Sequence, residues 1–222
     1  MKDVLFVAPH SDDESLGCGG TILRHRDAGD RIHWLLVTVS HVDYGFSAER
    51  IAEREKEIDR VAAHFRFDTT TRLNFPATMI DSMPLGQLVA AVSKVFRQIN
   101  PNVVYLPYRG DVHSDHTVTF DAVAACTKWF RYPSVERVLC YEAISETEFG
   151  INPDINGFRP NVFVDISAHL ETKMMILREY RGELGEFPFP RSEQAVRALA
   201  AYRGATAGVA AAEAFMLLRE RM

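Results

Sequence analysis

Short apolar segments rich in β-branched and aromatic residues alternate along the chain with longer segments of helical periodicity. The apolar segments lie at Asp3–Ala8, Arg31–Thr38, Thr71–Phe75, Asn102–Leu106, Arg137–Glu142 and Asn161–Asp165. Short, continuously apolar runs of this kind are typical of strands that are buried on both faces. The alternation therefore predicts βαβ units and an α/β fold: a doubly wound, mostly parallel sheet with helices on both faces.

The segments between these strands are long enough for helices. They are Gly20–Ala28, Ser47–His64, Leu85–Ile99, Asp115–Phe130, His169–Arg181 and Glu193–Tyr202. In the second of them, apolar residues recur at helical intervals from Ile51 to Ala62, which places one apolar stripe against the sheet. Gly182–Ser192 contains two glycines and two prolines and is predicted to be a loop, whereas Ala205–Arg221 fits either a helix or a strand.

Length and composition narrow the class of protein. With 222 residues, the chain is long enough for one sizeable core and short for two, so we expect a single domain over residues 1–222. The share of hydrophobic residues, 47%, is ordinary for a globular protein. A net charge of −5 without a long cluster of Lys and Arg argues against a nucleic-acid partner. The sequence leaves open whether the chain forms a homo-oligomer.

The sequence also bears on the cellular compartment. The apolar run Val4–Ala8 is too short for a signal peptide, and no segment approaches the roughly 20 apolar residues of a membrane span. Three widely spaced cysteines, Cys18, Cys126 and Cys140, fit reduced thiols better than a disulfide framework. We therefore expect a cytoplasmic protein without a membrane span.

A polar cluster follows the first predicted strand directly, in the sequence PHSDDE at residues 9–14. Ligands of open α/β sheets bind at the carboxyl ends of the strands, which is where this cluster lies. One imidazole and three carboxyl groups in five positions would repel one another without a cation, so the cluster predicts a divalent metal. The alternative is a polar turn in which Asp12 or Asp13 caps the next helix.

A second polar cluster, residues 111–116 (DVHSDH), follows the predicted strand Asn102–Leu106. His113 and His116 are three residues apart, so both imidazoles can face one way if a helix begins there. Taken alone, the pair could be exposed polarity at a helix start. Because two strand ends of one sheet can converge, the joint occurrence of both clusters favours one metal site.

Together the two clusters resemble the PIG-L/LmbE family of zinc-dependent N-deacetylases. The resemblance rests on PHSDDE at 9–14, LGCGG at 16–20 and HSDH at 113–116. Supporting matches farther along the chain are Arg54, Glu57, Phe163–Ser167, Lys173, Arg203, Gly204 and Ala212–Phe215. It implies a Rossmann-like fold and a hydrolase that removes the N-acetyl group from an N-acetylglucosamine-type sugar or sugar conjugate. Ser11 stands where the family motif more often has proline.

The resemblance also assigns roles. It makes His10, Asp13 and His116 the metal ligands and Asp12 the general base. Two histidines and one carboxylate leave a zinc coordination position open for water, although Fe²⁺ or another divalent metal would suit the same ligands. His113 is implied to stabilise the oxyanion or to protonate the leaving amine.

Two further assignments are implied. Asp115 is expected to keep His113 charged and oriented. Arg54 resembles a family arginine that contacts substrate oxygens, although Arg54 and Glu57 could also be an ordinary surface pair on a helix. Two other functions stay open: deacylation of a non-sugar amide in secondary metabolism, and a catalytically inactive metal-binding protein.

Overall fold

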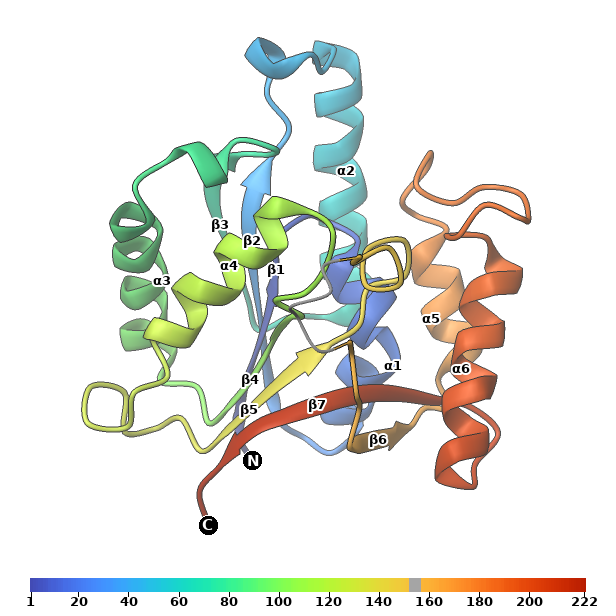
Figure 1. Cartoon of the computed structure of the whole chain (residues 1–222). Coiled ribbons are helices and arrows are strands. Elements are labelled where there is room, and N and C mark those ends of the chain that lie inside the picture. Colours follow the sequence, from blue (N-terminus) through green and yellow to red (C-terminus); the bar gives the residue numbers. More distant parts are fainter. Residues whose placement is uncertain (152–156) are drawn as a thin grey trace.

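A seven-stranded sheet forms the centre of the computed structural model, which describes residues 1–151 and 157–222 (Figure 1). The strands are β1 (Asp3–Ala8), β2 (Arg31–Val39), β3 (Thr69–Pro76), β4 (Val103–Pro107), β5 (Arg137–Tyr141), β6 (Val162–Asp165) and β7 (Ala212–Glu220). Their order is β3-β2-β1-β4-β5-β7-β6. The strands β1 to β5 pair in parallel, and only β7 runs antiparallel to its neighbours β5 and β6. The predicted α/β class with a mostly parallel sheet is confirmed.

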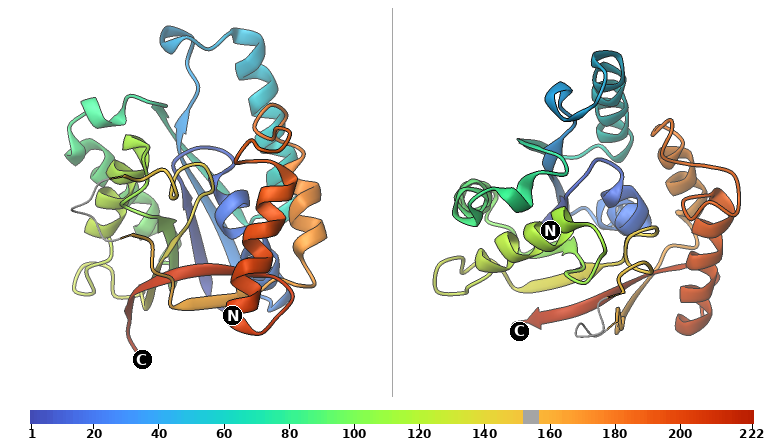
Figure 2. Two further views of the ribbon diagram at one scale, coloured as in Figure 1. Left: turned by 45° about the vertical axis from the view of Figure 1, so that its right-hand side comes forward. Right: turned by 45° about the horizontal axis from the view of Figure 1, so that its top comes forward.

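Helices cover both faces of this sheet, as predicted (Figures 1 and 2). They are α1 (Asp13–Asp27), α2 (Ala48–Phe65), α3 (Leu85–Ile99), α4 (Ser114–Ala125), α5 (Leu170–Leu177) and α6 (Glu193–Ala207), with short 3-10 helices η1 (Val42–Tyr44) and η2 (Ile80–Ser82). The core on one face is built from α3 and α4. The core on the other face is built from α1, α2 and the end of α5, and α6 packs on α5 and the start of α1.

Strand β1 shows why the strand segments are continuously apolar. Leu5 and Val7 face the core under α3 and α4, whereas Val4 and Phe6 face the core under α1 and α2. All four side chains are fully buried. A strand covered on both sides needs apolar residues at every position, because neither face meets water.

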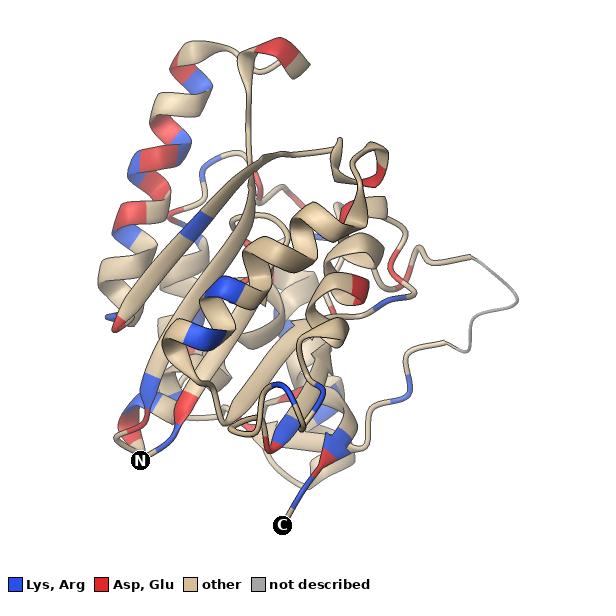
Figure 3. Ribbon diagram, turned by 90° about the vertical axis from the view of Figure 1, so that its left-hand side faces the viewer, with Lys and Arg blue, Asp and Glu red and all other residues tan. Residues whose placement is uncertain are grey.

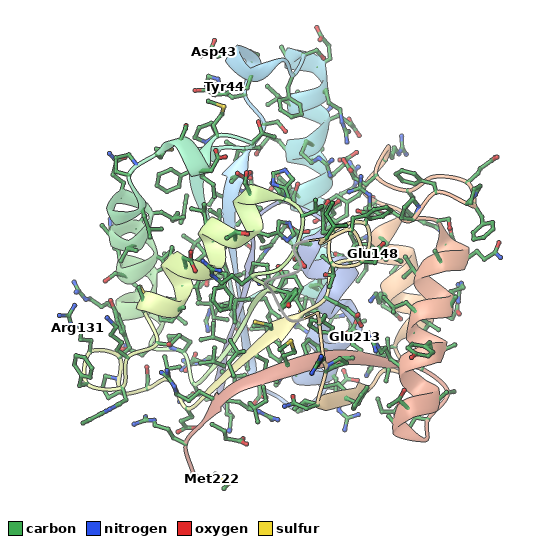
Figure 4. The ribbon with its side chains drawn as sticks, in the orientation of Figure 1. Asp43, Tyr44, Arg131, Glu148, Glu213 and Met222 are labelled. Atoms are coloured by element: carbon green, nitrogen blue, oxygen red, sulfur yellow. The ribbon has the colours of Figure 1, made fainter. Side chains whose placement is uncertain are left out.

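Helix α2 carries its predicted apolar stripe. Ile58, Val61 and Phe65 are buried, and charged residues alternate along the exposed side of the helix (Figure 3). The segment that leads from β2 to α2 projects from the sheet, and Asp43 and Tyr44 mark its tip (Figure 4). None of the helices in the described ranges combines the length and apolar character that a membrane crossing needs.

Helix α1 is longer than predicted, because it begins at Asp13 and not at Gly20. Glycine lowers helix propensity. The first two turns of α1 were missed because the sequence pattern there includes Gly17, Gly19 and Gly20. These glycines serve close packing. A Cβ at Gly17 would lie 2.4 Å from Cδ2 of Tyr141, and one at Gly20 would lie 2.5 Å from Cγ2 of Ile166.

Other boundaries also differ from the prediction. Helix α4 ends at Ala125, five residues before the predicted end, and leaves Trp129 and Phe130 exposed in the following loop. Helix α5 ends at Leu177. The segment Ala205–Arg221, which fitted either a helix or a strand, begins with the last residues of α6. Most of it forms strand β7.

The strand order places two loops next to each other. From β1 the chain moves outward through β2 to β3, and it returns to the other side of β1 for β4 and β5. The carboxyl ends of β1 and β4 therefore flank the point at which the strand order reverses, where such sheets open a crevice for ligands. Both polar clusters of the sequence lie in the loops at this crevice, at the upper end of the sheet in Figure 1.

Candidate active site

His10, Asp13 and His116 lie together in this crevice. Nδ1 of His10 is 3.4 Å from Oδ2 of Asp13, and Nε2 of His116 is 3.3 Å from the same oxygen. The ligand atoms of the three residues all lie within 4.8 Å of one another. Nε2 of His116 is buried and forms no hydrogen bond within the described ranges. The donor set and this unused nitrogen fit a divalent metal such as zinc, which favours imidazole nitrogen and carboxylate oxygen.

A carboxylate holds the other nitrogen of each imidazole. Nε2 of His10 is 2.9 Å from Oδ2 of Asp115, and Nδ1 of His116 is 2.8 Å from Oδ2 of Asp111. Asp115 also accepts the backbone N–H of Thr78 at 2.7 Å. A carboxylate in this place fixes the ring and leaves the opposite nitrogen to bind a metal. The atoms left free to face a metal would thus be Nδ1 of His10 and Nε2 of His116.

The charges of these groups depend on one another. Burial lowers the pKa of His10, but hydrogen bonds with Asp115 and Asp13 outweigh it and raise that pKa to about 9. Burial also lowers the pKa of His116, which the carboxylates of Asp13 and Asp111 raise well above its ordinary value. The two imidazoles hold the pKa of Asp13 well below its usual range, against the effect of burial. A divalent cation would replace the protons on the imidazoles.

Asp115 contacts His113 through its backbone and His10 through its carboxylate. Its carboxylate binds His10 and Thr78, whereas His113 is oriented by the backbone N–H of Asp115, which donates to Nδ1 of His113 at 3.1 Å. Because Nδ1 accepts this bond, the hydrogen of the ring lies on Nε2. Burial and the neighbouring His10 lower the pKa of His113. Asp115 thus orients His113 through its backbone, and its expected role in keeping His113 charged stays a prediction.

A second set of potential ligands, His10, His113 and Asp115, also lies within reach of one cation. In that set, the Asp115 oxygen nearest His10 already accepts two hydrogen bonds, and Nδ1 of His113 is occupied by the backbone. In the set of His10, Asp13 and His116, Oδ2 of Asp13 accepts only the backbone N–H of His10, at 2.8 Å, and Nε2 of His116 forms no hydrogen bond within the described ranges. This set is therefore the better candidate for the metal.

Asp12 precedes helix α1 in an unusual backbone conformation, with φ at 139°. Residues other than glycine rarely adopt such positive φ values, and they cluster at functional sites when they do. The backbone N–H of Asp12 donates to Oε2 of Glu14 at 3.2 Å. The other oxygen of Glu14 accepts the phenol of Tyr180 at 2.7 Å and the hydroxyl of Ser15 at 2.6 Å. Buried Glu14 thus helps to hold the strained turn that aims Asp12.

The electrostatic surroundings of Asp12 suit a group that moves protons. Burial and the adjacent Asp13 carboxylate raise the pKa of Asp12 to about 7, although Arg191 and Arg54 oppose this rise. Nη1 of Arg191 lies 3.4 Å from Oδ2 of Asp12. A carboxyl group that titrates near neutrality can both accept and return a proton at physiological pH.

A cavity of about 260 Å³ opens onto these residues. Its floor includes His10, Asp12, Asp13 and His113, and its apolar wall includes Val39, Phe46, Ile51 and Ile58. The polar residues Ser11, Thr38, Ser40 and Thr78 also line the cavity. A floor of ionisable groups below a partly apolar wall is the usual form of a small-molecule site.

Arg54 reaches this cavity from α2. Its Nη1 donates to the carbonyl oxygen of Ser11 at 3.2 Å, beside Asp12, and its Nε lies 3.4 Å from Oε2 of Glu57. Glu183 forms a further close ion pair with Arg54. Arg54 is therefore part of the cavity wall. Because Glu57 is fully buried, its pair with Arg54 is not an ordinary surface pair.

Three residues near the site were not assigned from the sequence. Asp111 belongs to the second polar cluster. Its position five residues before His116 could have indicated that its carboxylate contacts the His116 imidazole. Glu183 and Arg191 lie in the loop Gly182–Ser192, which carries no pattern that relates it to the distant first cluster. Only the fold brings this loop to the cavity.

Comparisons with known proteins agree with this geometry. A sequence profile of PIG-L, described as GlcNAc-PI de-N-acetylase, matches residues 5–127, a span that contains both polar clusters. The chain is similar to diacetylchitobiose deacetylase of Thermococcus kodakarensis, with 28% identity over 94% of this chain and 80% of that protein. It is also similar to a probable N-acetyl-α-D-glucosaminyl L-malate deacetylase 2 of Bacillus anthracis, with 28% identity over 83% of this chain and 89% of that protein.

A solved structure shares the whole fold. The conserved protein TT1542 from Thermus thermophilus is 28% identical and superposes with a TM-score of 0.79, covering 100% of this chain and 97% of that one. The similarity therefore extends beyond the span of the profile to the C-terminal elements, including β7.

Proposed function

Because this chain belongs to the PIG-L family, described as GlcNAc-PI de-N-acetylase, we propose that it is a metal-dependent amide hydrolase acting on an N-acetylglucosamine-type sugar or sugar conjugate. The observation that carries this proposal is the set of His10, Asp13 and His116, of which His10 and Asp13 line a cavity beside the carboxyl group of Asp12. Two relatives that are named as deacetylases of N-acetylated sugars support the substrate class.

His10, Asp13 and His116 would hold the metal, with zinc as the expected ion and Fe²⁺ as an alternative. When bound, such a cation lowers the pKa of a coordinated water towards about 7 and polarises the amide carbonyl. Asp111 and Asp115 keep the two imidazoles oriented for this task.

Asp12 is proposed as the general base. It lies on the cavity floor next to Asp13, and its pKa of about 7 allows it to accept a proton from the attacking water. The protonated Asp12 then returns this proton to the nitrogen of the leaving amine. The same carboxyl group therefore serves both halves of the reaction, and a charged His113 is not required.

His113 is proposed to stabilise the oxyanion of the tetrahedral intermediate. Its Nδ1 accepts a backbone hydrogen bond, so the Nε2–H of the neutral ring can donate to the developing negative charge. Arg54 is proposed to contact oxygen atoms of the substrate from the cavity wall.

Acetate release from a panel of N-acetylated sugars and N-acyl amines tests the proposal. The zinc-loaded chain is expected to release acetate from at least one N-acetylglucosamine derivative, and chelation with subsequent return of zinc should abolish and restore this activity. Cleavage of N-acyl amines alone would favour the non-sugar deacylase. Stoichiometric zinc binding without any acetate release would identify a metal-binding protein without turnover.

A further inference from the structure

The cavity contains two arginines, Arg54 and Arg191, and carboxylates already pair with both of them. Arginine is the side chain that most often recognises carboxylate and phosphate groups of ligands. Whether these two guanidinium groups are available therefore decides which charge the cavity accepts on a substrate.

Glu183 lies between the two guanidinium groups. One of its carboxylate oxygens forms a close ion pair with Arg54, and the other lies 3.4 Å from Nη2 of Arg191. The side chain of Glu183 is 20% exposed, so solvent screens these pairs only in part. The Glu183 carboxylate thus occupies the place between both arginines that an anionic group of a ligand would take.

Each arginine also has a second carboxylate partner. Nε of Arg54 lies 3.4 Å from Oε2 of fully buried Glu57. Nη1 of Arg191 lies 3.4 Å from Oδ2 of Asp12. Arg50 of α2 shares two of these carboxylates, because it lies 3.0 Å from Glu57 and 3.4 Å from Glu183. Three carboxylates thus face three arginines before any substrate enters.

Two further carboxylates line the same cavity. Glu55 lines it from α2 and forms a close ion pair with Arg72, whereas Glu146 lines it from the loop after β5. No ion pair of the Glu146 carboxylate occurs within residues 1–151 and 157–222. An anion in the outer cavity would meet Glu183 and Glu146 without an unpaired arginine to offset them.

We infer that this site selects substrates without an anionic group, and that Glu183 enforces this selection by occupying Arg54 and Arg191. The inference rests on the proposed amide hydrolase function and narrows its substrate class to uncharged, hydroxyl-rich N-acyl sugars. A sugar hydroxyl can accept a hydrogen bond from an arginine that stays paired with a carboxylate. A phosphate or carboxylate would have to displace Glu183 or remain close to it, and like charges in contact are unfavourable.

Two matched pairs of substrates test this inference on the zinc-loaded chain. The first pair is the carbamoylmethyl glycoside of N-acetylglucosamine and its carboxymethyl analogue, which have nearly the same shape and differ in charge. The second pair is N-acetylglucosamine and its 6-phosphate. We expect kcat/KM for acetate release to favour the uncharged member by on the order of 10-fold, mainly through KM. Equal or faster cleavage of the anionic members would overturn the inference.

The variant Glu183→Gln removes the charge and keeps the shape. It is expected to raise kcat/KM for the anionic member relative to the uncharged member by on the order of 10-fold, because Arg54 and Arg191 become available. Glu186→Gln is the matched control, since Glu186 is exposed on the same loop and lies outside the cavity lining. An unchanged ratio in Glu183→Gln would contradict the role of Glu183.

A measurement without turnover separates this inference from the proposed function. If no glycoside releases acetate, the hydrolase proposal fails, but calorimetric titration of the zinc-loaded chain with both carbamoylmethyl and carboxymethyl glycosides still reports the charge preference. Tighter binding of the uncharged glycoside would support charge selection. Equal or tighter binding of the anionic glycoside would overturn it.

Discussion

Asp12 combines a strained backbone with a buried carboxyl group, and both properties suit a catalytic base. We predict that Asp12→Ala keeps stoichiometric zinc but lowers kcat by roughly 10²- to 10⁴-fold, because proton transfer from a positioned base contributes about that factor. Metal analysis and acetate release on the same sample measure the two effects separately. Asp43→Ala, at the exposed tip of η1, serves as the control with unchanged turnover. Full activity in Asp12→Ala would refute the assignment of the base.

His116 is expected to behave differently, because it contributes a ligand atom and is fully buried. The variant His116→Ala should lose both zinc binding and acetate release. Zinc at 100 times its dissociation constant should stabilise the unchanged chain by about 2.7 kcal/mol, which corresponds to roughly 2–4 °C in Tm for each kcal/mol. Thermal unfolding with and without zinc measures this shift. A similar zinc-dependent shift in His116→Ala would show that the metal binds elsewhere.

At the scale of single residues, the sequence indicated the candidate ligands because they lie in two dense polar clusters directly after strands. It could not indicate which carboxylate faces which imidazole, since that depends on side-chain directions across a crevice. The carboxylate of Asp115 accordingly contacts His10, whereas only its backbone N–H contacts His113. Arg191 was beyond prediction because 179 residues separate it from Asp12.

Among the elements, α1 contains glycines at which neighbouring side chains leave no room for a Cβ atom. We predict that Gly17→Ala lowers the free energy of unfolding by about 1–3 kcal/mol, because the new Cβ would lie 2.4 Å from the Tyr141 ring. Gly86→Ala in α3 is the matched control. No atom lies within 4 Å of a Cβ at that position, so alanine should be neutral or stabilise by up to about 1 kcal/mol. Urea unfolding of both variants distinguishes packing from helix propensity, and a stabilised Gly17→Ala would contradict the packing role.

The strands were predicted more closely than the helix ends, for a physical reason. A strand buried on both faces must be apolar throughout, and its limits show in composition, as in β1. Helix ends depend on capping and tertiary packing. The start of α1 lies inside a polar and glycine-rich stretch that resembles a loop, and the end of α4 comes before two exposed aromatic residues, Trp129 and Phe130.

At the scale of the whole molecule, a buried ion pair ties the two ends of the chain together. Nζ of Lys173 in α5 donates to Glu213 of β7 and to the carbonyl oxygen of Leu16 in α1, each at 2.7 Å. Glu213, labelled in Figure 4, also accepts the backbone N–H groups of Gly20 and Thr21 at 2.8 Å. Three elements thus meet at one buried salt bridge.

We predict that Lys173→Ala lowers the free energy of unfolding by about 3–5 kcal/mol, since it leaves the buried Glu213 carboxylate without its cation. Lys56→Ala is the control, because Lys56 forms an exposed pair with Glu53 at 3.8 Å, and surface changes usually stay within about 0.5 kcal/mol. Chemical denaturation of both variants gives the comparison. Equal losses would mean that the buried pair does not support the fold.

The position of Glu213 has a consequence for biosynthesis. Its bond to Gly20 spans 193 residues, so β7 can insert between β5 and β6 only after these 193 residues have been translated. Both polar clusters therefore leave the ribosome long before the strand that anchors the helix carrying Asp13 exists. The nascent chain should gain the proposed activity only after β7 has been translated, so that polypeptides that end before β7 hold the candidate ligands without the anchor of α1.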